Sequence, residues 1–326
     1  MTQATTAAEA APADSSAPAL ILVVGSINMD LVARCPRIPA PGETILGSDF
    51  ARHPGGKGAN GATAAGRLAD PRRQRVAMLG AVGRDENGAA LRRNLRERGV
   101  DAERVRELDG VPTGVALITV SDAGENSIVV VPGANGCLRP EDVEAILPSL
   151  SPAVVLMQME IPLETVARGA ARGRAAGARV LLDPAPAPAT LADGLLGMID
   201  VLMPNEGELA ALTGMPTGSV EEAARAAARL RERGVRAVVV KRGAQGALIV
   251  DERGARPVGA PRVRVVDTTG AGDCFDGALA VALSEGQEID TAARFATHAA
   301  ALACTRLGAQ EAQPTREDVE RVLSPT

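Results

Sequence analysis

Short apolar runs alternate along the chain with longer stretches of helical periodicity. The runs are rich in Val, Leu and Ile, a pattern typical of buried strands in a parallel sheet. They cover residues 20–25, 76–79, 154–157, 180–182, 201–203 and 235–241. The stretches between and after them are rich in Ala, often with Arg and Glu, and predict helices over residues 87–98, 163–176, 220–233 and 275–283. This alternation predicts an α/β fold in which helices cover both faces of a mostly parallel sheet.

Two segments break the alternation. Residues 31–50 carry three prolines before a short β-type run, and residues 113–131 alternate apolar and polar positions around a turn at 122–126, which predicts a β-hairpin. We expect these segments to pair into a small sheet beside the main domain, formed by about residues 31–54 and 111–132. Since ligands bind at the carboxyl ends of parallel strands, such a sheet could serve there as a lid.

The N-terminal segment differs from the rest of the chain in composition. Residues 1–19 are rich in Ala, Thr, Ser and Pro and lack a basic start followed by an apolar block. This pattern predicts a disordered tail rather than a signal peptide, and leaves residues 20–326 as one large domain. We see no apolar run of the length that crosses a bilayer.

Charge and cysteine usage narrow the class of protein. The 326-residue chain has a net charge of -5, no Trp, no Tyr and three Phe. A chain without basic runs or aromatic stacking platforms is not expected to bind nucleic acid or an anionic membrane. The cysteines are far apart and form no CxxC pair; they are Cys35, Cys137, Cys274 and Cys304. This spacing disfavours a zinc site or a disulfide framework and favours a reducing compartment, so we expect a cytoplasmic protein.

The segment at residues 265–273 reads Val-Val-Asp-Thr-Thr-Gly-Ala-Gly-Asp and carries the strongest chemical signal. We expect a β-branched strand end, a turn at Gly270 and Gly272, and then a helix. The glycines permit close approach of a ligand, and unpaired helix-start amides together with the helix dipole favour an anion. Asp273 would lie beside this anion hole, which suits phosphorylation of an alcohol. Taken alone, an N-cap Asp after a Gly turn explains the same residues equally well.

Two familiar nucleotide-binding signatures are absent. Residues 55–60 read Gly-Gly-Lys-Gly-Ala-Asn, but Gly58 stands where a phosphate loop has Ser or Thr, and Ala51 stands where it has Gly. Ile27 occupies the second Gly position of the dinucleotide fingerprint. The sequence therefore disfavours the P-loop kinases and the simple dehydrogenases.

Polar side chains instead follow the predicted strands or lie in the Gly-rich loop. They are Asn28, Asp30, Asn60 and Glu160. Each alone is explained as a turn or cap residue. As a set at one edge of one sheet, they indicate a pocket for a polyol.

Three motifs, in this order and spacing, resemble the ribokinase-like (PfkB) sugar kinase family. They lie at residues 25–30, 55–60 and 267–273. Further matches point to the ribose-phosphorylating members; they lie at residues 41–44, 113–118, 133–135, 157–160, 183–187, 204–206 and 305–310. The resemblance covers residues 20–323. It implies a ribokinase-like three-layer α/β/α core with a small β-sheet lid.

The resemblance also implies a reaction, namely ATP-dependent phosphorylation of D-ribose at its 5-hydroxyl. Related kinases for deoxyribose, fructose or a nucleoside such as adenosine or pseudouridine remain alternatives, as does a sugar-binding regulator without catalysis. Family members commonly pair their lids, so a homodimer is expected.

Roles for individual residues follow from the same resemblance. Asp273 would be the catalytic base, and Gly270, Ala271 and Gly272 would supply the anion-hole amides. The sugar would be bound by Asn28, Asp30, Gly56, Lys57, Asn60 and Glu160, together with Asp273. The nucleotide and its phosphates would lie against Asn205, Glu208, Lys241, Gly243, Gly272 and Thr297, with Glu208 near Mg²⁺ through water.

A monovalent cation, K⁺, would lie beside the anion hole. Its oxygen ligands would come from Asp267, Thr269, Ala303, Arg306, Gly308 and Ala312. Three of the implied positions depart from the family pattern: Lys241 and Thr297 fall where members vary, and Ala312 offers only a backbone oxygen.

Overall fold

The computed structural model describes residues 18–324. Most of the predicted tail, residues 1–17, lies outside this range. The prediction was wrong for Ala19, which is the first residue of the first strand because its backbone pairs with that of Gln74. Between residues 18 and 324, no helix is long and apolar enough to cross a membrane.

A ten-stranded sheet runs through the centre of the described chain, in the order β14-β13-β12-β11-β10-β9-β1-β4-β5, with β6 also paired to β4. Its strands are β1 (Ala19–Val24), β4 (Gln74–Gly83), β5 (Val100–Asp101), β6 (Val105–Leu108), β9 (Pro152–Met157), β10 (Arg179–Leu182), β11 (Val201–Leu202), β12 (Ala237–Lys241), β13 (Ala247–Asp251) and β14 (Gly254–Val258). All pairings are parallel except those of β13 with β12 and β14. Every predicted apolar run falls on this sheet, so the prediction of a mostly parallel sheet is confirmed.

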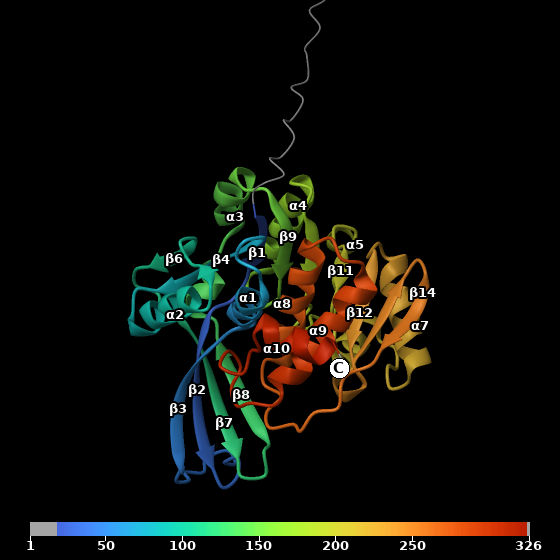
Figure 1. The fold of residues 1–326 in the computed structure, drawn as a ribbon. Coiled ribbons are helices and arrows are strands. Elements are labelled where there is room, and N and C mark those ends of the chain that lie inside the picture. Colours follow the sequence, from blue (N-terminus) through green and yellow to red (C-terminus); the bar gives the residue numbers. More distant parts are fainter. Residues whose placement is uncertain (1–17, 325–326) are drawn as a thin grey trace, which may run out of the picture.

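Helices cover both faces of the sheet (Figure 1). One face carries α1 (Lys57–Leu68), α2 (Glu86–Glu97), α8 (Ala271–Ser284), α9 (Ile289–Ala303) and α10 (Arg316–Leu323). The other carries α3 (Pro140–Ile146), α4 (Leu163–Ala175), α5 (Asp193–Leu196), α6 (Glu206–Thr213) and α7 (Val220–Glu232). Along β1, Ile21 and Val23 join the first core, whereas Leu22 and Val24 join the second. Because strand side chains alternate in direction, the sheet separates two cores, and the three-layer architecture is confirmed.

Four further strands form a separate small sheet, in the order β3-β2-β7-β8, which projects from the main body (Figure 1). They are β2 (Asn28–Cys35), β3 (Asp49–Gly55), β7 (Gly114–Ser121) and β8 (Asn126–Val131). The predicted hairpin is confirmed as the antiparallel pair β7–β8. The first lid segment was placed too late, because β2 starts at Asn28 and the proline-rich residues 36–48 form a loop. Prolines cannot donate to a strand ladder, which explains the gap.

The segment before α8 also differs from prediction. Val265 and Val266 form no strand; their exposed fractions are 58% and 50%, and the Val266 N–H donates to the carbonyl of Cys304 at the end of α9. A carboxylate oxygen of Asp267 then accepts the N–H of Thr269 at 2.9 Å, which closes a turn. This turn starts the helix at Ala271, four residues before the predicted start.

Candidate active site

The N-terminus of α8 leaves two amides open. Gly270 precedes the helix in a left-handed conformation with φ 72°, and no side chain caps it. The Ala271 N–H, which was predicted to belong to the anion hole, instead donates to Thr268 O at 3.2 Å, while those of Gly272 and Asp273 have no backbone partner within residues 18–324. Two open amides on the positive end of a helix can hold an anion.

Asp273 lies in the first turn of α8, and its exposed fraction is only 7%. Its Oδ2 accepts a hydrogen bond from Asn60 Nδ2 at 2.8 Å. Its Oδ1 lies 3.7 Å from the ammonium nitrogen of Lys57. The base candidate is therefore flanked by a fixed donor and a positive charge.

The Gly-rich sequence predicted a loop here, but Lys57 and Asn60 belong to the first turn of α1. Gly56 caps this helix with φ 87°, and a Cβ there would lie 2.7 Å from the backbone nitrogen of Asn28. A Cβ on Gly58 would lie 2.6 Å from the nitrogen of Ser26. The two glycines therefore let the start of α1 lie against the chain that leaves β1.

The predicted sugar-binding side chains converge around this helix start. Glu160 Oε2 accepts hydrogen bonds from the Ser26 hydroxyl at 2.6 Å and from the Lys57 N–H at 3.1 Å. Burial, followed by the charge of Glu160, raises the pKa of Asp30 to about 7, although His53 opposes the shift. Asp30 belongs to β2, so the small sheet contributes directly to this group of side chains.

Asn28 is held by Asn135, which the sequence analysis included in a family-like motif without giving it a role. Asn135 of the 3₁₀ turn η1 (Gly133–Cys137) donates to Asn28 Oδ1 at 2.7 Å. The same amide accepts the N–H of Ile27 at 2.9 Å and donates to its carbonyl at 3.1 Å. Asn135 therefore fixes the backbone between β1 and β2.

A buried ion-pair network lies next to the base. The Lys241 ammonium contacts Asp183 at 3.1 Å and Asp276 at 3.2 Å, and Lys57 lies 4.0 Å from Asp183. Burial by itself would lower the pKa of Lys241, but the carboxylates of Asp183 and Asp276 raise it above its ordinary value. The two ammonium groups thus offset part of the charge of three buried carboxylates, those of Asp183, Asp273 and Asp276, which lie within 4.8 Å of one another.

Asp276 was missed from the sequence, although its spacing gave a signal. Residues three apart on a helix share a face, so Asp276 had to lie near Asp273. Lys241 was expected in the nucleotide site. Its ammonium nitrogen lies close to Gly272 at the start of α8, because a Cβ added to that glycine would be 3.6 Å from the nitrogen.

Three of the remaining nucleotide-side residues follow the neighbouring strands β11 and β12, and the fourth lies on a helix. Asn205 and Glu208 cap α6 reciprocally, each side chain accepting the other's N–H at 2.8 Å. Burial, then the charge of Asp183, raises the pKa of Glu208. Gly243 starts a 3₁₀ turn with φ 54°. Thr297 is buried in α9, where its hydroxyl donates to Ala293 O at 2.7 Å.

The predicted cation ligands lie on two loops joined by one carboxylate. Asp267 Oδ1 accepts from the N–H and hydroxyl of Thr269, and its Oδ2 accepts the N–H of Gly308 at 2.9 Å. Ala303 ends α9, and Ala312 is buried. The Arg306 side chain turns to Asp318, at 3.6 Å, so only its backbone oxygen is free to face a cation.

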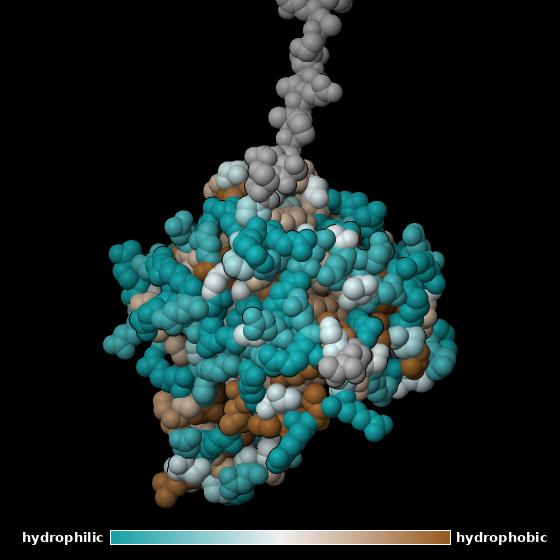
Figure 2. Space-filling view, viewed as in Figure 1, coloured by the Kyte–Doolittle hydropathy of each residue, from teal (hydrophilic) through white to brown (hydrophobic). Residues whose placement is uncertain are grey.

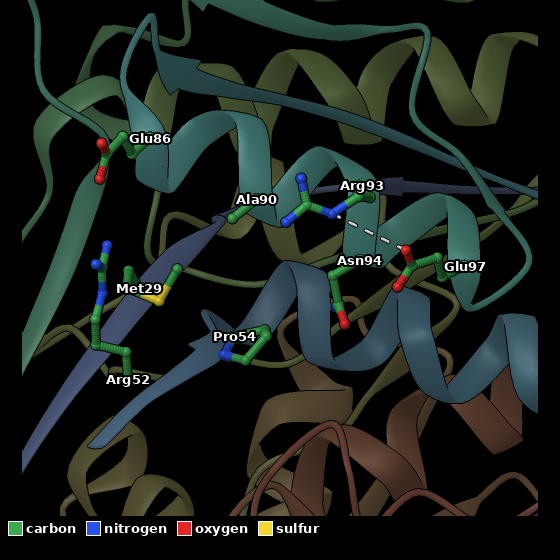
Figure 3. Close-up of a pocket in the computed structure, with 8 residues that line it drawn as sticks. All are labelled: Met29, Arg52, Pro54, Glu86, Ala90, Arg93, Asn94 and Glu97. Atoms are coloured by element: carbon green, nitrogen blue, oxygen red, sulfur yellow. Dashed lines mark ion pairs between the residues drawn. The ribbon is translucent and has the colours of Figure 1, made fainter. Parts of the chain in front are cut away.

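A cleft of about 460 Å³ lies elsewhere, between α2 and the small sheet (Figure 3). It is lined by Met29, Arg52, Pro54, Glu86, Ala90, Arg93, Asn94 and Glu97. None of these is a predicted site residue, and the cleft lacks the base and the open amides. We therefore place the active site at the α1 and α8 helix starts.

A model of the pfkB family carbohydrate kinases matches residues 18–316. The chain belongs to this family. The protein is therefore a sugar kinase.

Full-length relatives support the same assignment. Ribokinase of Bacillus subtilis is 40% identical over 308 residues, covering 93% of this chain and 99% of that protein. Deoxyribokinase of Salmonella typhi is 36% identical over 305 residues, covering 93% and 98%. The solved structure of Arabidopsis thaliana ribokinase complexed with ribose and ATP aligns with a TM-score of 0.86 at 35% identity, covering 95% of this carbohydrate kinase and 100% of that chain.

Proposed function

We propose that this sugar kinase transfers the γ-phosphoryl group of ATP to the 5-hydroxyl of D-ribose, giving ribose 5-phosphate and ADP. The observation that carries the proposal is the buried carboxylate of Asp273 beside two open amides at the start of α8. The Bacillus subtilis ribokinase and the Arabidopsis complex with ribose and ATP support the choice of substrates.

In the proposed reaction Asp273 accepts the proton of the sugar hydroxyl as its oxygen bonds to phosphorus. The bond between the γ-phosphorus and the bridging oxygen breaks, and ADP leaves with the electron pair. General base catalysis is worth about 10²- to 10⁴-fold. The amides of Gly272 and Asp273 face the place where charge develops on the phosphoryl oxygens, which suits a reaction that depends on positioning and charge stabilisation.

Sugar binding would combine acceptors and donors from both sheets. Asn28 and Asp30 of β2 would bind the sugar's hydroxyls on the side of the small sheet. Asn60 and Glu160 would bind them on the side of the main domain. The backbone of Gly56 and the ammonium of Lys57 would complete the pocket between them.

ATP would lie along the carboxyl ends of β11 and β12, against Asn205, Glu208, Lys241, Gly243, Gly272 and Thr297. Mg²⁺ prefers oxygen ligands and retains waters, and when bound it neutralises phosphate charge. Glu208 is partly buried and faces the charge of Asp183, and both effects raise its pKa. A nearby cation would offset these effects, so Glu208 fits a water-mediated role at Mg²⁺.

We also propose a K⁺ site behind the α8 turn. The donor set is all oxygen, from Asp267, Thr269, Ala303, Arg306, Gly308 and Ala312, and Asp267 already joins the two loops that supply it. A bound cation would stabilise the loop geometry without contacting phosphate. We expect strong stimulation of turnover by K⁺ over Na⁺; equal rates in the two salts would argue against the site.

The protein is proposed to work in the cytoplasm as a homodimer joined through the small sheet. The exposed apolar residues of the small sheet include Leu117, Ile128 and Val129. Figure 2 shows apolar side chains gathered over this sheet. A patch of this kind on a sheet with an open edge favours a partner surface.

A coupled assay for ADP release tests the proposal across D-ribose, 2-deoxyribose, fructose, adenosine and pseudouridine, each in K⁺ and in Na⁺. Ribose-dependent release is expected. Preference for deoxyribose is the specific rival, because a deoxyribokinase is 36% identical over nearly the whole chain. Failure to turn over any of these substrates while ribose still binds would favour a sugar-binding regulator.

A further inference from the structure

We propose that Gln310 is a positioning residue for the general base: acting through Asn60, it determines which oxygen of Asp273 is held and which is free to take the sugar's proton. The inference rests on the proposed function in one respect, the role of Asp273 as the base. Gln310 lies in the turn after α9, far in sequence from both residues, and its exposed fraction is 1%.

A continuous chain of hydrogen bonds links Gln310 to the base. Gln310 Nε2 donates to Asn60 Oδ1 at 2.9 Å, and Asn60 Nδ2 donates to Asp273 Oδ2 at 2.8 Å. On its other side, Gln310 Oε1 accepts from Asn94 Nδ2 at 2.6 Å and from the Thr63 hydroxyl at 3.2 Å. Asn94 also lines the cleft in Figure 3, so the outer end of the chain reaches that cleft.

The direction of this chain is fixed by the carboxylate. An ionised Asp273 can only accept, so Asn60 must turn its NH₂ group toward it and its oxygen toward Gln310. Gln310 must then present its own NH₂ group to Asn60, which leaves its oxygen for Asn94 and Thr63. Both of these can donate. Every member of the chain is satisfied when it runs in this direction.

The chain also distinguishes the two oxygens of Asp273. Oδ2 is held by Asn60, whereas Oδ1 lies 3.7 Å from Lys57, beyond hydrogen-bond distance. Oδ1 is therefore the atom that accepts the proton when the sugar O–H bond breaks and the O–P bond forms. Oδ2 then becomes the carbonyl oxygen and keeps its bond to Asn60, so the chain need not rearrange.

Other charged groups face Asp273 from the elements around it. Lys57 of α1 favours its ionised form, as does Lys241 of β12 more distantly. The acids oppose it; they are Asp30 of β2, Glu160 after β9, Asp183 after β10 and Asp276 of α8. With several acids nearby, loss of the Asn60 donor would shift the balance toward the protonated form.

The test compares Gln310→Met with Gln313→Met. Gln313 is a matched control because it is buried in the same turn but donates to Ala309 O and not to the chain. In folded Gln310→Met we expect kcat to fall by about tenfold to a hundredfold. The rising limb of the pH–kcat profile should move to higher pH, while the KM for ATP stays unchanged. A wild-type profile in that variant would overturn the inference.

A second variant covers the case in which Gln310→Met does not fold. In Gln310→Glu a protonated carboxyl can still donate to Asn60, but an ionised one cannot. We expect kcat to be retained at low pH and to fall at a pH where the wild type is still active. A profile without this added fall would contradict the inference.

A readout that needs no substrate separates this inference from the proposed function. The Asp273 carboxyl can be followed by ¹³C NMR over pH, assigned with Asp273→Asn. Its titration should move to higher pH in either Gln310 variant and stay in place in Gln313→Met. If no sugar is turned over but the titration moves, the proposed reaction fails and the positioning role stands; an unmoved titration overturns the role.

Discussion

Asp273 and Asn60 illustrate how one carboxylate can be kept ready for chemistry in a buried site. Asp273→Asn preserves the shape of the side chain but cannot take a proton. We expect kcat to fall by about 10²- to 10⁴-fold, with ribose binding by calorimetry and the fold by circular dichroism retained. Near-wild-type turnover would remove Asp273 from the role of base.

Asp30 predicts a pH effect on stability. Its pKa is raised to about 7 by burial and then by Glu160, so between its ordinary value of 3.8 and about 7 the folded protein keeps a proton that the unfolded chain has lost. Stability must fall as pH rises through this window. We expect the Tm advantage of ligand-free Asp30→Asn over wild type to grow from pH 4 to 7 and then level off. Parallel Tm curves would contradict the raised pKa.

Sequence reasoning reached some of these residues and not others, for a physical reason. Asn28, Asp30 and Glu160 come soon after buried apolar runs, and the edge of a parallel sheet brings such positions together. Gln310 and Asn135 lie in the family-like motifs at residues 305–310 and 133–135, but nothing in those motifs indicated a role for either side chain. Their partners are 250 and 107 residues away in sequence, and only the tertiary fold brings a buried amide to face another amide at that separation.

At the scale of elements, the site depends on close packing of α1 against α8. A Cβ on Gly277 of α8 would meet the carbonyl of Gly61 and lie 2.8 Å from Ala64 Cβ and 2.9 Å from Ala65 N. Small residues on both helices thus bring the Asn60 turn and the Asp273 turn together. The Gly-rich string at residues 55–60 was expected to be a loop because glycines disfavour helices, but this packing overrides that preference.

Gly277→Ala should therefore separate the two helices. We expect a loss of about 1–3 kcal/mol in the free energy of unfolding, and a lower kcat because Asn60 moves from Asp273. Gly194→Ala in α5 is the control: a Cβ there meets nothing within 4 Å, so the change should be neutral or stabilising by up to about 1 kcal/mol. Equal effects of the two substitutions in denaturant titrations would contradict the packing argument.

At the scale of the whole molecule, the small sheet leaves an apolar row uncovered. Leu117 pairs across strands with Val129, and their exposed fractions are 47% and 58%. If this face joins two copies, Leu117→Glu should shift the mass measured by light scattering from dimer to monomer. Leu163→Glu, at 48% exposure on α4, should leave the mass unchanged. A wild-type monomer at micromolar concentration would refute the assembly.

The two sheets are connected around Asn135. Asn135 holds Ile27 and Asn28 where the chain enters the small sheet, and Gly56, where the chain leaves it, lies against Asn28. Asp30 is two residues farther out, about 7 Å along the strand. Any rotation of the small sheet would carry Asp30 through a wider arc than Asn28. Asn28 would therefore bind the sugar at a constant position, while the displacement of Asp30 would determine how long the sugar stays bound.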